Sequence, residues 1–266
     1  MNARPTNPDL EKAFKTNKTY YEMMRQHNTQ TGDVPSIELE IIRFIERIKK
    51  GQTLLDAGSG EGTITLWIAE QKPEIKVVGV DLSPVGIEMS QNDAKAKKLE
   101  NLTLQVDNLE KLSLPDSMAD KVLSQSVVEH VPDLSAMLSE LYRVMKPGAE
   151  GIIRVSNAAS GFHFSLSHYF FRRLEVLPHK PSLSLEEGNY YQHRHNFDAH
   201  ELTCYTLTGL LEKAGFRITQ MTTFPDHLKD EPGPAWRRLI LRSLMLFRSL
   251  PLIKLIGPTA IVEFKK

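Results

Sequence analysis

Leu54-Leu55-Asp56-Ala57-Gly58-Ser59-Gly60-Glu61-Gly62 is the stretch that decides the fold, and Val77-Val78-Gly79-Val80-Asp81 follows it. Each run is a short apolar strand that leads to a carboxylate, and the first continues into a glycine-rich turn. Glycine lacks a Cβ and adopts positive φ, so such a turn bends tightly and approaches a ligand closely. An acid at the tip of the next strand is placed to bind the two hydroxyls of a ribose. The two runs together predict a nucleoside-binding site.

Apolar strands and helices alternate from residue 53 to residue 155. Strands are expected at 101–107, at the start of 120–133 and at 151–155, and helices at 63–72, 84–98 and 138–148. A Lys-Pro-Gly run ends the last helix, because proline and glycine cannot continue it. This alternation predicts a parallel sheet covered by helices on both faces. Ligands of such sheets bind beyond the carboxyl ends of the strands.

The glycine pattern is G-x-G-x-G, and Thr63 stands where a dinucleotide fingerprint requires its third glycine. Residues 120–148 carry the run D-x-V-x-S-x-S-V-V-E-H-V-P-D…L…R-V-M-K-P-G. Together these motifs resemble the class I S-adenosylmethionine-dependent methyltransferases, in the small-molecule branch that includes the quinone-ring enzymes. The resemblance is close over about 50–156 and loose over 197–223.

That resemblance implies an α/β fold: a doubly wound, mostly parallel seven-stranded sheet with helices on both faces (Rossmann-like methyltransferase fold) and helical insertions. A strand opening at 216–219 would be the sixth. The strand at 259–264 would close the sheet, antiparallel and beside the fifth and sixth strands.

The resemblance also implies S-adenosyl-L-methionine as cofactor, no metal, and a set of donor-binding residues. Asp56 organises the loop near the amino-acid end of the donor, Gly58 and Gly60 let the backbone approach it, and Asp81 binds both ribose hydroxyls. The remaining positions lie at the ends of later strands. Leu82 packs on the adenine, Asp107 lies near the adenine amino group with Asn108 and Leu109 beside it, and Ser124 and Gln125 line the floor near the sulfonium. The alternative for each is an ordinary turn residue at a strand end.

His130 follows the fourth strand, at the mouth where an acceptor would bind. A neutral imidazole can accept a hydroxyl proton near physiological pH, so His130 is the candidate general base. The alternative is structural, because the run Glu-His-Val-Pro-Asp also suits a loop that caps a helix starting at 134.

Two segments interrupt the alternation of strands and helices, and the sequence leaves the roles of their residues open. Residues 157–196 are rich in aromatic residues and hold five of the nine histidines. There, His193 and His195 suit acceptor contact, plain packing or half of a metal site. The sequence of residues 236–250 predicts an imperfect amphipathic helix with an arginine face. That helix suits peripheral contact with a membrane, a lid over an apolar acceptor, or packing on its own domain.

The composition excludes some classes of protein. The 33 basic and 33 acidic residues give no net charge, so no overall field favours nucleic acid. Cys204 is the one cysteine, and no signal peptide or spanning apolar run is evident, which favours a cytoplasmic address and leaves a membrane-peripheral one open. One domain is expected: a helical cap at 1–50, a core at 51–156 and 197–224, insertions at 157–196 and 225–258, and a closing strand at 259–266.

The sequence thus predicts methyl transfer from S-adenosylmethionine to a hydroxyl of a small, lipophilic or ring-containing acceptor. N- or C-methylation, an NAD(P)-dependent oxidoreductase and a non-catalytic nucleoside-binding module remain as alternatives, because a fold does not fix chemistry. The sequence does not identify the acceptor or the oligomeric state.

Overall fold

The structure is a computed structural model that describes residues 37–157, 202–223, 243, 246, 250, 257 and 259–266. The expected cap before residue 37 lies outside the described residues. So do nearly all of both insertions, with the histidines at 193 and 195 and most of the segment 236–250 for which a helix is expected.

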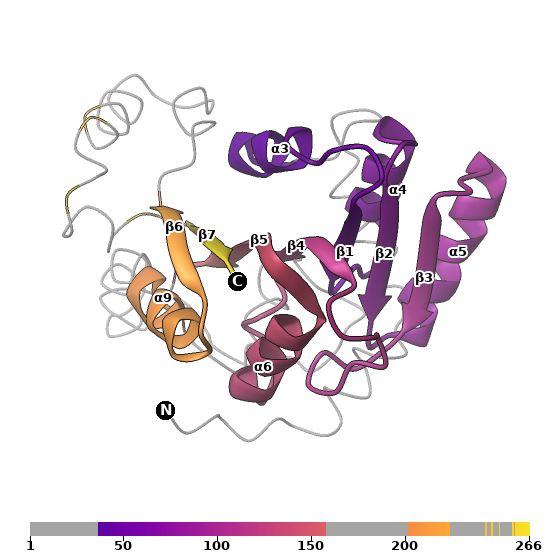
Figure 1. Cartoon of the computed structure of the whole chain (residues 1–266). Helices are drawn as coiled ribbons and strands as arrows, with labels where there is room; N and C mark the ends of the chain where they lie inside the picture. The colour runs from indigo at the N-terminus through magenta and orange to yellow at the C-terminus, as the bar shows by residue number, and fades with distance from the viewer. Residues whose placement is uncertain are drawn as a thin grey trace, which may run out of the picture.

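Seven strands form one sheet in the order β3-β2-β1-β4-β5-β7-β6 (Figure 1). They are β1 (Thr53–Ala57), β2 (Lys76–Asp81), β3 (Leu102–Val106), β4 (Ala119–Gln125), β5 (Met145–Ser156), β6 (Arg217–Thr222) and β7 (Thr259–Lys265). Strands β1 to β5 pair in parallel, and β7 is antiparallel to both β5 and β6. The predicted doubly wound sheet and its antiparallel closing strand are therefore confirmed.

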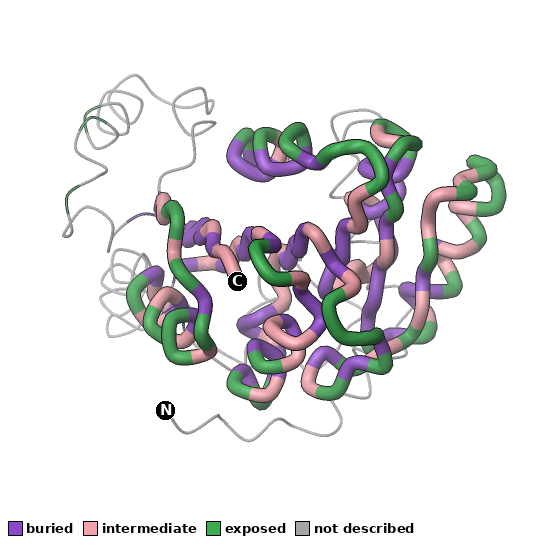
Figure 2. Tube along the Cα trace, in the orientation of Figure 1, coloured by how far each residue is buried: buried purple, intermediate pink, exposed green. Residues whose placement is uncertain are grey.

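The described helices are α3 (Leu39–Glu46), α4 (Thr63–Gln71), α5 (Pro84–Lys97), α6 (Leu134–Val144) and α9 (Cys204–Lys213). Two separate apolar clusters form on the two faces of the sheet, because neighbouring strand residues point in opposite directions. Leu54 packs with α3 and α4, whereas Leu55 packs with α6 and α9. Figure 1 shows α3 on one side of the sheet and α6 and α9 on the other. The central strands are accordingly buried on both faces (Figure 2).

Local signals set some helix ends as expected. Pro84 opens α5, and the Ser83 hydroxyl oxygen caps it by accepting from the Gly86 amide at 3.2 Å. The helix expected at 138–148 is present, but the bounds expected for it are wrong. Helix α6 begins at Leu134, capped by Asp133, and ends at Val144, where Met145 already pairs with Ala119 as part of β5. Pro147 disfavours helix at the residue before it, so the chain turns extended sooner than the Lys-Pro-Gly run suggests.

The sequence also predicts a helix that Asp198 caps and that runs through about Lys213, and the structure starts this helix later. Helix α9 begins at Cys204, and the Thr203 hydroxyl oxygen caps it by accepting from the Thr206 amide at 3.0 Å. Asp198 lies outside the described residues. Within the part of the chain that the structure describes, no helix combines the length and apolar character that crossing a bilayer requires.

Candidate functional site

The glycine-rich loop between β1 and α4 folds back over the end of β2. The amides of Gly58 and Ser59 both donate to the Val80 carbonyl, at 2.8 and 2.9 Å. Gly58 has a φ of +94°, and a Cβ there would lie 2.3 Å from a methyl group of Val127. A larger residue would therefore have to push the loop away from the strand ends, so the glycine keeps the backbone close to the ligand side of the sheet.

Asp81 ends β2 with both carboxylate oxygens held by backbone amides. The Gly60 amide donates to Oδ2 at 2.8 Å, and the Ser83 amide donates to Oδ1 at 2.9 Å. A carboxylate oxygen accepts two hydrogen bonds, so each keeps one acceptor position for a ligand. The structure thus fixes the orientation of the group that the sequence predicts to bind a ribose.

Asp56 is the penultimate residue of β1 and is 4% exposed. Its carboxylate accepts a hydrogen bond from the Thr65 hydroxyl on α4. Burial raises the pKa of Asp56 to about 7, opposed by the Thr65 bond and assisted by the negative charges of Asp81 and Glu61. Burial likewise raises the pKa of Asp81 to about 6, against its two amide hydrogen bonds. Both groups therefore sit where a positive ligand would stabilise their charged forms.

Glu61 is a third buried carboxylate that the sequence interpretation missed. It lies within the loop, is 5% exposed and accepts a hydrogen bond from the Thr63 hydroxyl at 2.9 Å. Its charge raises the pKa of both Asp56 and Asp81. The signal in the sequence is an acid between two glycines. Asp56, Glu61 and Asp81 are called the carboxylate cluster below.

The expected adenine side has an exposed apolar surface. Leu82 is 37% exposed and Val106 is 48% exposed, and Val106 pairs in register with Asp81. Single exposed apolar residues are common on protein surfaces, whereas a contiguous apolar patch marks a binding site. The exposure of Leu82 leaves it accessible for the expected contact with a base, and Val106 is a further exposed apolar residue next to Asp81 in the sheet.

Asp107 is engaged by its own loop. Its carboxylate accepts from the amides of Asn108 and Ser113 and from the side chains of Gln105 and Ser113. The Asp107 amide also donates to the Asp81 carbonyl at 2.9 Å, which places the two acids on neighbouring strand ends. Asn108 is exposed, and Leu109 is buried in the cluster of α6 and α9. These hydrogen bonds give Asp107 a structural role in the loop after β3. The expected contact with the adenine amino group would come in addition to that role.

At the end of β4, Ser124 is fully buried and its hydroxyl donates to the Ala57 carbonyl at 2.9 Å. Its side chain therefore ties β4 to β1. The next residue differs: the Gln125 side-chain oxygen is buried and has no hydrogen-bond partner among the described residues. The Ser59 hydroxyl in the glycine-rich loop is in the same condition. Buried polar atoms normally have partners, so both indicate a ligand surface.

His130 lies in the turn after β4, where its amide donates to the Val127 carbonyl at 2.8 Å. Its charge lowers the pKa of Asp81, so the two side chains are near enough to interact. The candidate base thus lies on the same edge of the sheet as the carboxylate cluster.

Arg154 and Glu38 form a second contact that the sequence did not predict, and it lies at the carboxyl ends of β4 and β5. Arg154 on β5 donates to Glu38 before α3 at 2.8 Å and to the Ser126 hydroxyl oxygen after β4 at 2.7 Å. Glu38 and Arg154 are 116 positions apart in the sequence, so no local pattern announces their contact. The pair fixes the start of α3 against the ends of β4 and β5.

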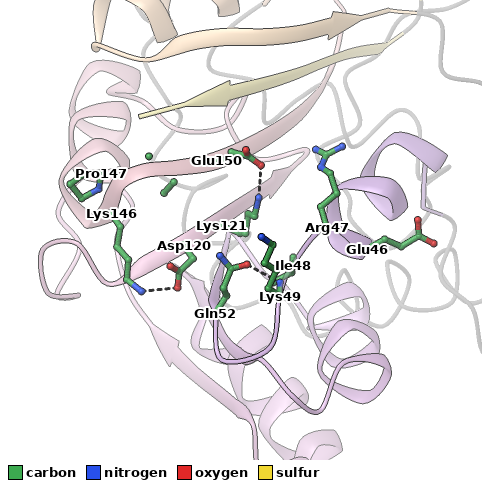
Figure 3. Close-up of a pocket in the computed structure, with 12 residues that line it drawn as sticks. Glu46, Arg47, Ile48, Lys49, Gln52, Asp120, Lys121, Lys146, Pro147 and Glu150 are labelled. Atoms are coloured by element: carbon green, nitrogen blue, oxygen red, sulfur yellow. Dashed lines mark hydrogen bonds and ion pairs between the residues drawn. The ribbon is translucent and has the colours of Figure 1, made fainter.

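A hollow of about 730 Å³ lies at the opposite edge, near the starts of β1, β4 and β5. Figure 3 shows that charged side chains bridge it: Lys121 contacts Glu150, and Lys146 contacts Asp120. These charges compensate one another, and ligands of such sheets bind at the other ends of the strands. We therefore place the functional site at the glycine-rich loop.

The raised pKa values predict that stability without ligand falls as pH rises. The folded forms of Asp56 and Asp81 hold protons up to about pH 7 and 6, whereas the unfolded chain releases them near 3.8. The resulting stabilisation is complete below pH 3.8 and is lost as pH rises through 6 to 7. Between pH 5 and 8 we expect the free energy of unfolding to fall by roughly 2–4 kcal/mol. Urea titrations at the two pH values measure it.

The control for this pH prediction is Asp56→Asn, which keeps an acceptor for Thr65 but cannot titrate. Its stability should depend less on pH than that of the natural chain. A free energy of unfolding that rises from pH 5 to 8 would contradict the assignment.

Comparisons with known proteins show the family of the chain. A family model described as a methyltransferase domain matches residues 48–195, more than half of the chain. A demethylmenaquinone methyltransferase of Geobacillus stearothermophilus is 32% identical over 132 residues, which cover 49% of this chain and 56% of that protein. Its counterpart in Thermus thermophilus is 29% identical over 192 residues, covering 69% and 84%.

The chain thus spans about half the length of several curated relatives that it matches. Among solved structures, a SAM-dependent methyltransferase of Methanosarcina mazei aligns with a TM-score of 0.58 and 21% identity, covering 86% of this chain and 99% of the other. At that identity the likeness shows the fold.

Proposed function

Because this chain belongs to the class I S-adenosylmethionine-dependent methyltransferases, we propose that it transfers a methyl group to a small, hydroxyl-bearing acceptor with a lipophilic or ring-containing body. The observation that carries this proposal is Asp81. Its carboxylate is oriented by the amides of Gly60 and Ser83 and keeps one acceptor position on each oxygen. A ribose offers two adjacent hydroxyls to such a group.

The rest of the edge fits the donor. The glycine-rich loop allows close approach of the backbone, and Leu82 with Val106 offers an apolar surface to a base. The unpartnered oxygens of Ser59 and Gln125 offer acceptors at the ends of β1 and β4. The carboxylate cluster favours a cation. S-adenosylmethionine, when bound, would supply a methyl group on a positively charged sulfur, which is already activated and leaves a neutral thioether.

With an activated donor, the chain mainly has to align the acceptor and remove its proton. His130 is the group we assign to that proton: its imidazole would take it from the acceptor hydroxyl and later release it to water. The Glu38–Arg154 pair would form a fixed wall beside the acceptor, since it closes the edge at β4 and β5.

The atom that receives the methyl group is a separate question. The similar proteins of Geobacillus and Thermus are named demethylmenaquinone methyltransferases, and another relative, from Geobacter sulfurreducens, is named a C-methyltransferase of quinone biosynthesis. Removing a proton from a ring hydroxyl raises the negative charge on the oxygen and, by delocalisation, on the ring carbons. Proton removal by His130 would therefore serve O- or C-methylation of a hydroquinone-like ring. In C-methylation the methylated carbon would then lose its own proton and the oxygen would regain one, which restores the aromatic ring and the hydroxyl.

Two measurements test the proposal. S-adenosylhomocysteine at about one hundred times its Kd should raise the free energy of unfolding by about 2.7 kcal/mol, and NADH should not. Methyl-labelled donor with a short-chain demethylmenaquinol should then give a labelled product, and NMR locates its methyl group. Stabilisation by NADH alone would favour an oxidoreductase. Tight donor binding with no product from this or any other hydroxylated ring tested would favour a non-catalytic module.

A further inference from the structure

Ser126 directly follows β4 and has a left-handed backbone conformation, with a φ of +56°. Residues with a Cβ rarely adopt positive φ, and serine is not among the types that do so readily. Of the residues that the structure describes, Lys98 and Ser117 are the other non-glycine residues with positive φ. Lys98 ends α5, a usual place for this conformation, and Ser117 lies in an exposed turn before β4. Ser126 instead lies at the carboxyl edge of the sheet, beside the functional site.

Arg154 supports this conformation from the neighbouring strand. Its Nη1 donates to the Ser126 hydroxyl oxygen at 2.7 Å, and its backbone carbonyl accepts from the Ser126 amide at 2.8 Å. The Nε of the same guanidinium donates to Glu38 at 2.8 Å, and these two side chains are only 16% and 8% exposed. Hydrogen bonds from a charged donor are strong where water is largely excluded. Glu38 therefore fixes the guanidinium, and the guanidinium holds Ser126.

The turn that follows Ser126 meets the functional site at two points. Val127 lies so close to the glycine-rich loop that a Cβ on Gly58 would be 2.3 Å from one of its methyl groups. His130, whose amide donates to the Val127 carbonyl, lowers the pKa of Asp81. The φ of Ser126 sets the direction in which the chain leaves β4. It therefore sets where both of these side chains lie relative to the loop and to Asp81.

We propose that Arg154 is a positioning residue for the donor site, which acts by holding Ser126 in its left-handed conformation. Without this support Ser126 relaxes in part of the molecules, Val127 leaves its place against Gly58, and only the remaining fraction binds the donor. The apparent affinity then falls by that fraction. This inference rests on the proposed function, because it requires the glycine-rich loop to hold the donor. A purely structural role of Arg154 would lower the stability of the fold and leave the affinity of the folded protein unchanged.

The test separates the conformation of Ser126 from its hydroxyl. Ser126→Ala and Ser126→Gly both remove the hydroxyl, but only glycine adopts positive φ without strain. Arg154→Lys keeps a positive charge beside Glu38 and offers one nitrogen in place of the fork that reaches two partners. The double variant Arg154→Lys/Ser126→Gly completes a mutant cycle. The control is Ser117→Ala with Ser117→Gly, because Ser117 has a φ of +52° at the other end of β4.

Calorimetry with S-adenosylhomocysteine at pH 8 measures the affinity of each folded variant, and urea titration measures its stability. Arg154→Lys and Ser126→Ala should each weaken binding roughly three- to tenfold, as expected if about 10–30% of the molecules keep the competent turn. Ser126→Gly should stay within about twofold of the natural chain, since glycine needs no support. For the same reason, Arg154→Lys should cost less than about twofold when Ser126→Gly is already present. Both Ser117 variants should bind as the natural chain does.

Several outcomes would overturn the role of Arg154. Equal weakening by Ser126→Ala and Ser126→Gly would show that the hydroxyl matters and the conformation does not. An equal cost of Arg154→Lys with and without Ser126→Gly, or a loss of stability without any loss of affinity, would also contradict it. If Arg154→Lys does not fold, the two Ser126 variants decide, because they leave the contact of Arg154 with Glu38 intact. A natural chain that binds no S-adenosylhomocysteine would refute the proposed function itself, and this inference with it.

Discussion

Replacing His130 by alanine is expected to lower turnover of a demethylmenaquinol acceptor by roughly 10²–10⁴-fold, the usual contribution of a positioned general base. The physical reason is that the acceptor hydroxyl would then have to lose its proton to water. The acidic limb of the pH–rate profile should disappear with the imidazole. Donor affinity at pH 8 should stay nearly unchanged, and calorimetry checks it.

The pH of that comparison matters because His130 lowers the pKa of Asp81. Its removal therefore raises that pKa, and below pH 7 a loss of donor binding would mix with the loss of catalysis. His130→Asn is the matched control, since it keeps hydrogen bonding but does not take up a proton. Turnover close to normal in both variants would leave alignment as the main catalytic device and give His130 a structural role in the turn after β4.

Replacing Asp81 is expected to weaken donor binding by at least about tenfold, because two charge-assisted hydrogen bonds to the ribose are lost, each contributing roughly 1.5–3 kcal/mol. Asp81→Ala would also leave the amides of Gly60 and Ser83 without their acceptor, so it disturbs the loop as well as the ligand. Asp81→Asn is the sharper variant, since its side-chain oxygen still accepts from one of these amides.

Asp107→Asn provides the comparison for Asp81. The Asp107 carboxylate is already engaged by Gln105, Asn108 and Ser113, so its replacement should weaken donor binding less. Calorimetry with S-adenosylhomocysteine measures both variants, with circular dichroism to verify the fold. Donor affinity that is unchanged in a folded Asp81→Asn protein would remove Asp81 from the site.

Strand-end acids could be located from the sequence because their signal is local. A short apolar run that leads to an acid, as at Asp56 and Asp81, predicts a buried strand and the residue at its tip. The glycines between them predict the turn. The structure confirms these positions on β1 and β2, with the antiparallel β7 beside β5.

What the sequence did not yield depends on contacts between distant segments. Glu61 lies in a loop without periodicity, and its burial follows from the way the loop attaches to the Val80 carbonyl. The contact of Glu38 with Arg154 joins α3 to β5 across the sheet. Ser124 was expected at the floor of the site, yet its direction was set by the neighbouring strand, which offers it the Ala57 carbonyl.

The position of β7 bears on how the chain is made. Strand β6 pairs with β7 alone in the described sheet, and β7 separates it from β5. During synthesis, β1 to β5 can assemble as they emerge, but β6 must wait for residues 259–265. Until then the edge of β5 stays open, and Phe216 lacks the ring of Phe264 that it meets at 4.7 Å. An open strand edge is a template for pairing with another chain. We therefore expect the chain to pair with other chains more readily before residues 259–265 have emerged than after β7 has covered the edge of β5.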